Sequence, residues 1–132
     1  MKKFVVIAGS LLVVGLLSPA AFAQGSGAGG FRMGFTEQGG EALYKGICQG
    51  CHMPNAQGAV GAGMYPALAK NPKLEVAGYP IAVVVNGQKA MPSFGNMLND
   101  QQVADVINYV RTHFGNNYKD KVSPADVKSA RP

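Results

Sequence analysis

The clearest element that the hydrophobic pattern predicts is a helix near the end of the chain. Five apolar residues recur there at helical spacing, at Val103, Val106, Ile107, Val110 and Phe114. Asn99, with Gln102 three residues later, is suited to cap the start of such a helix, and Gly115 is suited to end it. We therefore expect a helix from about Asn99 to Gly115 with one apolar face.

Two shorter helices are expected upstream. Thr36 is a suitable N-cap for a helix that runs toward Lys45 and carries Leu43 and Tyr44 on its apolar side. Farther on, Pro80 can open a helix over Ile81–Val85 that Asn86-Gly87 ends, although the valine run also permits a strand.

The remaining segments are expected to be irregular. Residues 53–72 are rich in glycine and proline, which predicts a loop. Residues 24–34 form a glycine-rich and serine-rich lead-in, which we expect to be flexible. Residues 116–132 are polar and predict a tail that either wraps onto the domain or frays. One small domain over residues 35–115 remains between them.

The start of the chain has the pattern of an export signal. Lys2 and Lys3 precede the apolar run Phe4–Leu17, and Ala21-Phe22-Ala23 fits a small-x-small cleavage site. We therefore expect a signal peptide over residues 1–23 and a location in the periplasm. The run is shorter than the roughly 18 residues of a spanning helix, so an uncleaved anchor is the weaker alternative. No cysteine lies at the cleavage point to take a lipid, so no stable membrane anchor is expected.

The charge of the chain argues against a nucleic-acid partner. Of its twelve basic residues, Lys2 and Lys3 lie in the expected signal peptide, so the exported part keeps ten basic and seven acidic residues. So small an excess is not the dense basic surface that nucleic acids require. Four lysines in the segments that flank the metal-site candidates described next could still steer the protein toward an acidic partner. They are Lys45, Lys70, Lys73 and Lys89.

Both cysteines of the chain fall in one pentad, Cys48-Gln-Gly-Cys51-His52, which has the C-x-x-C-H form of a covalent c-type haem site. Thiols three positions apart lie on one side of a helical turn, so both can form thioethers along one edge of a porphyrin. The imidazole of His52 then lies beneath the iron as its proximal ligand. The pentad predicts one covalent haem c, on which the folding of so small a domain is expected to depend.

Other chemistry of a C-x-x-C pair stays open at this point. A thioredoxin-like dithiol needs a βαβ frame, whereas the flanks here are glycine-rich loops and short helical patterns. A zinc site needs four ligands, and only His52 and the distant His113 could join the cysteines. A structural disulfide is compatible with an exported chain.

The sixth position on the iron separates an electron carrier from an open catalytic metal. The candidates are Met33, Met53, Met64, Met91, Met97 and His113. Met91 is favoured because it follows the Gly87 turn, precedes Pro92 and lies far enough beyond His52 for the chain to pass round the porphyrin. Met97 is the main competitor. A thioether ligand favours ferrous iron, which suits an electron carrier.

Four stretches make the sequence similar to the class I cytochromes c, in particular the small periplasmic single-haem members that serve bacterial dehydrogenases. They are Gly40–Tyr44, Cys48–His52, Tyr65–Leu68, and Ala90–Phe94 with the helix that contains Asn108–Val110. The glycine-rich start, the long tail and the enlarged loop at Met64-Tyr65 depart from the family pattern.

The resemblance implies an all-α fold, in which helices and irregular loops surround one covalent haem. Gly40 and Tyr44 would cross the last helix near Tyr109, and Pro66 would offer its carbonyl to Nδ1 of His52.

The same resemblance assigns further residues to the haem. Met91 would be the distal iron ligand, and Tyr65 and Phe94, which lie in the matching stretches, would contact the cofactor.

The expected function is the transfer of single electrons by a monomeric protein that is not an enzyme. Its donor would be a periplasmic dehydrogenase, and its acceptor a cytochrome oxidase or another respiratory component. The alternatives are a tightly bound cytochrome subunit of a dehydrogenase complex and an open-iron haem enzyme or sensor. A thiol oxidoreductase without haem is the remaining alternative.

Overall fold

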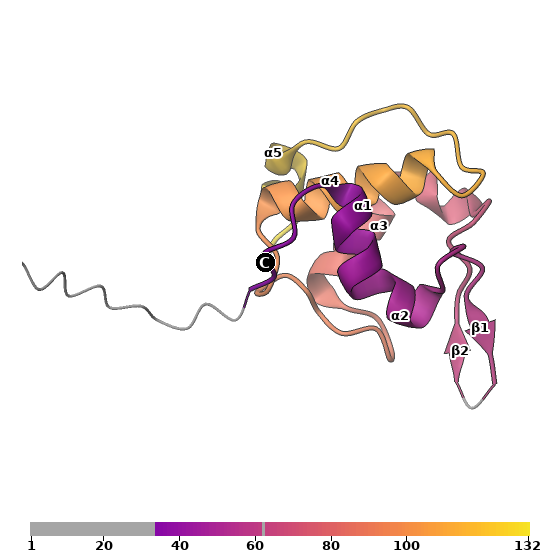
Figure 1. Cartoon of the computed structure of the whole chain (residues 1–132). Helices are drawn as coiled ribbons and strands as arrows, with labels where there is room; N and C mark the ends of the chain where they lie inside the picture. Colours follow the sequence, from indigo (N-terminus) through magenta and orange to yellow (C-terminus); the bar gives the residue numbers. More distant parts are fainter. Residues whose placement is uncertain (1–33, 62) are drawn as a thin grey trace, which may run out of the picture. The chain divides into compact units, whose positions relative to one another are not determined.

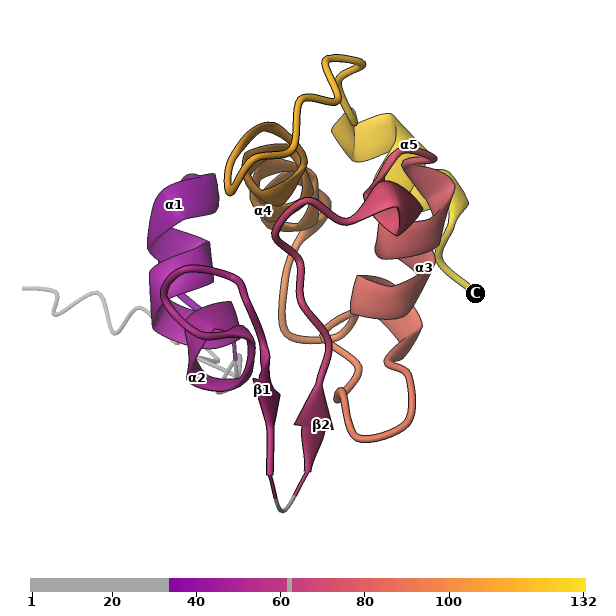
Figure 2. The same cartoon turned by 90° about the vertical axis from the view of Figure 1, so that its right-hand side faces the viewer.

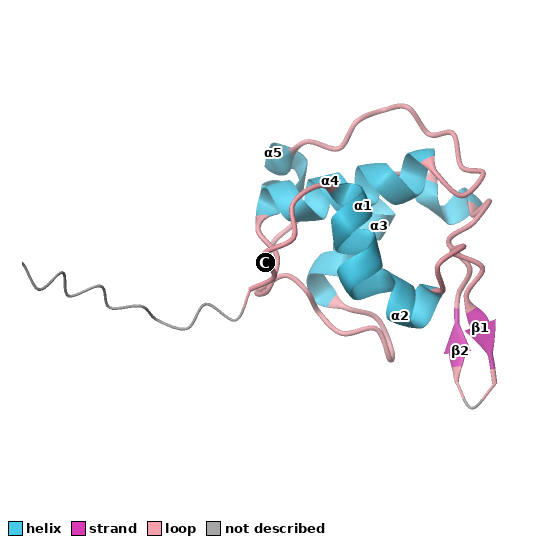
Figure 3. Ribbon diagram, in the orientation of Figure 1, coloured by secondary structure: helices cyan, strands magenta, loops and turns pink. Residues whose placement is uncertain are grey.

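The computed structural model describes residues 34–61 and 63–132 (Figure 1). The expected signal peptide, nearly all of the expected lead-in and Met33 lie outside the described residues. Helices joined by long loops make up the described part apart from one small hairpin, as Figure 3 shows, which agrees with the expected all-α fold. Its elements are α1 (Gly40–Leu43), the π-helical turn η1 (Tyr44–Cys48), α2 (Gln49–His52), β1 (Ala59–Val60), β2 (Met64–Tyr65), the 3-10 turn η2 (Pro72–Leu74), α3 (Gly78–Asn86), α4 (Asp100–Thr112) and α5 (Pro124–Ser129).

Helix α4 forms the centre of the core. The expected capping box is present, because the Asn99 side chain accepts from the Gln102 N–H and the Gln102 side chain accepts from the Asn99 N–H. The periodic apolar residues Val103, Val106, Ile107 and Val110 are buried. The helix ends at Thr112, earlier than expected, because Phe114 and Gly115 already have left-handed backbone angles.

The expected start of the first helix is wrong. Thr36 does not cap it; the helix begins at Gly40, and Gly39 precedes it with φ of 81° and no side-chain cap. The side-chain amide of Gln102 explains the difference, since it donates to the carbonyls of Phe35 at 2.8 Å and Glu37 at 3.0 Å. These bonds hold the chain before Gly39 against the start of α4.

A close crossing joins α1 to α4. A Cβ on Gly40 would lie 2.2 Å from the carbonyl oxygen of Asp105 and 2.5 Å from Cβ of Tyr109. Only glycine therefore allows the two backbones to approach this closely. Beside the crossing, the Tyr44 ring packs against Tyr109 and Phe114, with centroids 5.8 and 4.9 Å apart. The crossing that the family resemblance implied is confirmed.

The other expected elements differ in detail. The valine run forms helix α3 and not a strand. The glycine-rich and proline-rich segment is mostly loop, but it also contains the antiparallel pair of β1 and β2, in which Ala59 faces Tyr65. In Figure 2, the helical segment Gly40–His52 lies on one side, α3 and the chain that follows it lie on the other, and the hairpin projects below them. None of the helices in the described part is long and apolar enough to cross a bilayer.

The segment 116–132 wraps onto the domain, which settles the choice between wrapping and fraying. Its residues Val122 and Val127 are buried. The fully buried Arg111 ties it to the rest of the fold, because its guanidinium donates to the carbonyls of Leu74 and Glu75 and to the carboxylate of Asp120.

The crossing predicts that Gly40→Ala is destabilising. Because the new Cβ would meet backbone atoms, the helices must separate, and we expect the free energy of unfolding to fall by about 1–3 kcal/mol. Denaturant titration of the haem-containing protein measures this. Gly78→Ala in α3 is the control, since no atom lies within 4 Å of its added Cβ. Equal losses in the two variants would contradict the interpretation.

The Arg111 contact predicts a dependence of stability on pH. The hydrogen bond from Arg111 lowers the pKa of the Asp120 carboxyl below its ordinary value of 3.8. The ionised carboxylate therefore stabilises the fold at pH values above the ordinary pKa. This contribution is lost as the pH falls through the lowered pKa. Asp120→Asn should lower the melting temperature at pH 7, and its difference from the unmodified protein should shrink toward pH 3.

The control is Glu75→Gln, since Glu75 meets Arg111 through its backbone carbonyl alone. A difference between Asp120→Asn and the unmodified protein that stays constant from pH 7 to pH 3 would contradict the assignment.

Candidate metal centre

The two cysteines lie on one continuous helical segment, at its change from the π-helical turn η1 to α2. Cys48 ends η1 and is half-buried, and Cys51 in α2 is exposed. Both are free thiols. Burial, reinforced by the neighbouring Cys51, raises the pKa of Cys48 to about 11. Because residues three positions apart share a face of a helix, the two cysteines lie on the same side of this segment.

The imidazole of His52 is held in one orientation. It is buried, and its Nδ1 lies 2.9 Å from the carbonyl oxygen of Pro66. A carbonyl can only accept, so Nδ1 carries the proton and donates. The other nitrogen, Nε2, then keeps its lone pair free for a metal.

The loop after the motif brings the Pro66 carbonyl back to His52. Met53, with φ of 67°, ends the helix, and the Tyr44 hydroxyl donates to its carbonyl at 2.7 Å. Gly58, with φ of 66°, lets the hairpin close, since a Cβ there would lie 2.1 Å from the carbonyl oxygen of Tyr65. The hairpin thus returns the chain to His52 at Pro66.

Met91 lies in the segment between α3 and α4. Its N–H donates to the Gln88 carbonyl at 2.9 Å, and its own carbonyl accepts from the Gln88 N–H at 3.0 Å. Gly87, with φ of 75°, starts this turn, and a Cβ there would lie 2.7 Å from the Met91 carbonyl oxygen. The side chain is half-buried. Figure 2 shows the chain that follows α3 on the side of the domain opposite α2.

Four other candidate residues differ in how far they are buried. Met64 is 78% exposed at the hairpin, and Tyr65 beside it is 39% exposed. His113 is exposed and stacks on Tyr109 at 4.1 Å. Phe94 is half-buried and packs on Phe35, with centroids 6.3 Å apart. The structure brings Pro66 to His52, and it places Met91 on a separate turn.

This donor set fits a haem c. Two thiols on one helical segment, followed by a histidine whose Nδ1 is already bonded, are groups that would provide the covalent attachment and a nitrogen ligand. In residues 34–61 and 63–132, no three His, Cys, Asp or Glu side chains are grouped to hold a metal ion by themselves. The zinc alternative thus gains no support from the described part of the chain.

Two arginines that join separate segments of the chain were missed by the sequence analysis. Arg111 is fully buried on α4, where the apolar periodicity gave no reason to expect a cation. Arg131 donates to the carbonyls of Gly95 and Leu98 and to the carboxylate of Asp100. Their partners are mainly backbone carbonyls, which leave no signal in a sequence.

The fold and the site together define a class I cytochrome c. Residues 36–110, more than half of the chain, match the family described as cytochrome c oxidase, cbb3-type, subunit III. The chain belongs to this family of cytochrome c domains. Its cytochrome c domain is therefore of the electron-transfer type that holds one haem c.

Several curated proteins are similar in sequence. The cytochrome c subunit of gluconate 2-dehydrogenase from Pantoea cypripedii is 35% identical over 74% of this chain and 25% of its own length. The cytochrome c subunit of a quinone alcohol dehydrogenase from Gluconobacter oxydans is 35% identical over 70% of this chain and 22% of its own length. The chain thus spans about a quarter of these relatives.

A smaller relative and a solved structure complete the comparison. Cytochrome c6 from Bumilleriopsis filiformis is 33% identical over 55% of this chain and 86% of its own length. The crystal structure of cytochrome cL from Methylophaga aminisulfidivorans has a TM-score of 0.50 and 23% identity, and it covers 70% of this chain and 64% of its own. This last likeness supports the fold alone.

Proposed function

We propose that this chain carries single electrons in the periplasm, from a dehydrogenase to a respiratory acceptor. The observation that carries the proposal is the bond from His52 Nδ1 to the Pro66 carbonyl, directly after the two cysteines. It leaves Nε2 of His52 as a ligand in a fixed orientation. A bound haem c supplies the redox chemistry, since its iron changes between the ferric and ferrous states.

In this proposal each candidate residue has a separate task. Cys48 and Cys51 would attach the cofactor, and His52 and Met91 would hold its iron. The turn from Gly87 to Met91 would present the thioether to the iron. Tyr65 and Phe94 would contact the ring. With two protein ligands on the iron, no position would be open for a substrate, which suits electron transfer.

The proposed donor rests on the relatives, two of which are named as cytochrome c subunits of a gluconate and a quinone alcohol dehydrogenase. The exposed Lys70, Lys73 and Lys89 would steer an acidic partner, while Lys45 is already paired with Glu41 at 2.6 Å. The same relatives favour a second candidate function, in which the chain is a tightly bound subunit of a dehydrogenase complex. Purification from native cells separates the two, because only a bound subunit co-purifies with the catalytic chain.

The attachment is tested by removing the thiols. Cys48→Ser combined with Cys51→Ser should abolish covalent haem, because serine forms no thioether. The measurement is the haem stain of the denatured protein on a gel, which detects only attached cofactor. Met64→Leu, on the exposed hairpin, is the control and should keep the stain. Persistence of the stain in the double variant would contradict the assignment of the cysteines.

The axial assignment is tested at Met91. Ferric haem with a methionine ligand has a weak far-red absorption band, and Met91→Ala should abolish it because alanine offers no thioether. Met97→Ala is the matched control, since Met97 lies six positions later in the same segment, and it should keep the band. Loss of the band in Met97→Ala alone would transfer the ligand role to Met97. Absence of the band from the unmodified protein would favour an open or bis-histidine iron.

A further inference from the structure

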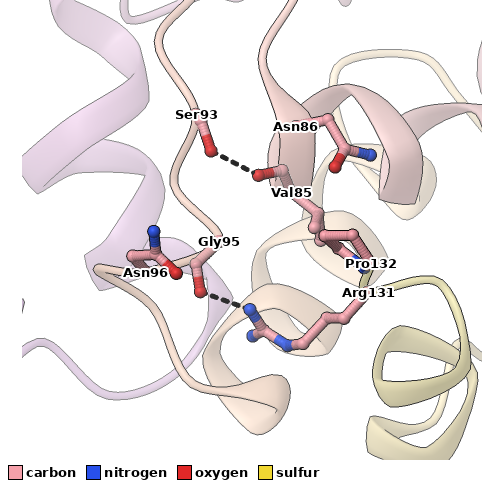
Figure 4. Close-up of a pocket in the computed structure, with 7 residues that line it drawn as sticks. All are labelled: Val85, Asn86, Ser93, Gly95, Asn96, Arg131 and Pro132. Carbon is pink, nitrogen blue, oxygen red and sulfur yellow. Dashed lines mark hydrogen bonds between the residues drawn. The ribbon is translucent and has the colours of Figure 1, made fainter.

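The segment that carries Met91 is held by one arginine from a distant part of the chain. The guanidinium of Arg131, which follows α5, donates from Nη1 to the carbonyl of Gly95 and from Nη2 to the carbonyl of Leu98 at 2.9 Å. Its Nε donates to the Asp100 carboxylate at 2.6 Å. Figure 4 shows the bond to Gly95. One side chain therefore joins the middle of the segment, its end and the first turn of α4.

These bonds have no evident substitute. Gly95 and Leu98 lie outside the helices, and within the described part of the chain no other group donates to their carbonyls. The side chains of Arg131 and Asp100 are only 24% and 30% exposed, so water competes weakly for the contact. Hydrogen bonds from a charged donor in such surroundings are stronger than those between neutral groups.

Helix α5 fixes the position of Arg131. A capping box between Ser123 and Asp126 starts the helix, and the fully buried Val127 anchors it to the core. The N–H of Arg131 then bonds to the Lys128 carbonyl at 3.3 Å. Helix α5 therefore places the guanidinium beside the segment. This helix lies outside residues 36–110, the part matched by the family.

Gly95 follows shortly after Met91 in the chain, so the bond that Arg131 donates to its carbonyl can affect the position of Met91. Met91 is fixed to Gln88 at one end, and Gly95 donates to the Val85 carbonyl of α3 at 3.1 Å at the other. Pro92 restricts the backbone between them. A pocket of about 170 Å³ borders Val85, Ser93, Gly95 and Arg131, and beside it the Ser93 hydroxyl donates to the Val85 carbonyl at 2.6 Å (Figure 4).

We propose that Arg131 is a positioning residue for the methionine ligand of the haem iron. By joining Gly95 and Leu98 to α4 and α5, it would stabilise the arrangement in which the Met91 thioether stays on the iron. It thereby controls how easily an external ligand takes that place. This inference rests on the proposed role of Met91 as the axial ligand.

The test is imidazole binding to the ferric, haem-containing full chain. Imidazole can bind only when the thioether has left the iron, so its apparent dissociation constant reports the open fraction. Arg131→Ala should lower that constant about tenfold or more, as the loss of charge-assisted hydrogen bonds implies. The far-red band is followed during the titration. Arg131→Lys keeps a charge but not the planar fork, and it should give an intermediate constant.

A matched control separates positioning from general stability. Val122→Ala removes buried packing from the same C-terminal segment without touching the Arg131 contacts. It should lower the melting temperature and leave the imidazole constant unchanged. Asp100→Asn weakens one of the three contacts of Arg131 and should have a smaller effect than Arg131→Ala.

The outcomes distinguish the two proposals. If the unmodified protein lacks the far-red band, Met91 is not the ligand and the inference fails with the proposed function. If the band is present but Arg131→Ala and Arg131→Lys bind imidazole as the unmodified protein does, only the role of Arg131 is refuted. An equal shift in Val122→Ala would also refute it. If Arg131→Ala does not fold, the comparison of Arg131→Lys with Val122→Ala decides in the same way.

Discussion

The backbone of α1 lies directly on that of α4, and the rest of the domain depends on this contact. There is no room at Gly40 for a side chain beside Asp105 and Tyr109. The crossing fixes the direction of the helical segment Gly40–His52, and with it the position of the cysteines and of His52. The motif carries the reactive groups, but a glycine two turns earlier determines where they lie. The aromatic rings of Tyr44, Tyr109 and Phe114 then fill the space beside the crossing.

Directed polar contacts supplement the small apolar core. Arg111 joins η2 to the segment after α4, because it donates to the carbonyls of Leu74, Glu75 and Asp120. Arg131 does the same for the segment between α3 and α4. Arginine is suited to this task because its planar fork offers five donors to acceptors that lie apart. The two arginines thereby join to the helices those segments that apolar packing alone would not hold.

The sequence predicted what depends on local patterns. The capping box at Asn99, the buried face of α4 and the loop between the haem motif and η2 follow from residue type and spacing, and the close crossing at Gly40 followed from the family resemblance. The start of the first helix was wrong because the Gln102 side chain, remote in sequence, holds the preceding residues. The roles of Arg111 and Arg131 were missed because most of their acceptors are backbone carbonyls, which every residue has. At the site, the motif named Cys48, Cys51 and His52, whereas the closing of the hairpin onto Gly58 emerged only in three dimensions.

The His52 imidazole donates to a backbone carbonyl, which determines the kind of mutation that can change this hydrogen bond. Replacing the side chain at position 66 does not delete the carbonyl, so an alanine scan would pass over the contact. The positions that control it are those that set the path of the backbone, above all Gly58 and the length of the hairpin between β1 and β2. Evolution can therefore adjust the basicity of the His52 imidazole by insertions and deletions in the hairpin, while the residues of the C-x-x-C-H motif stay the same.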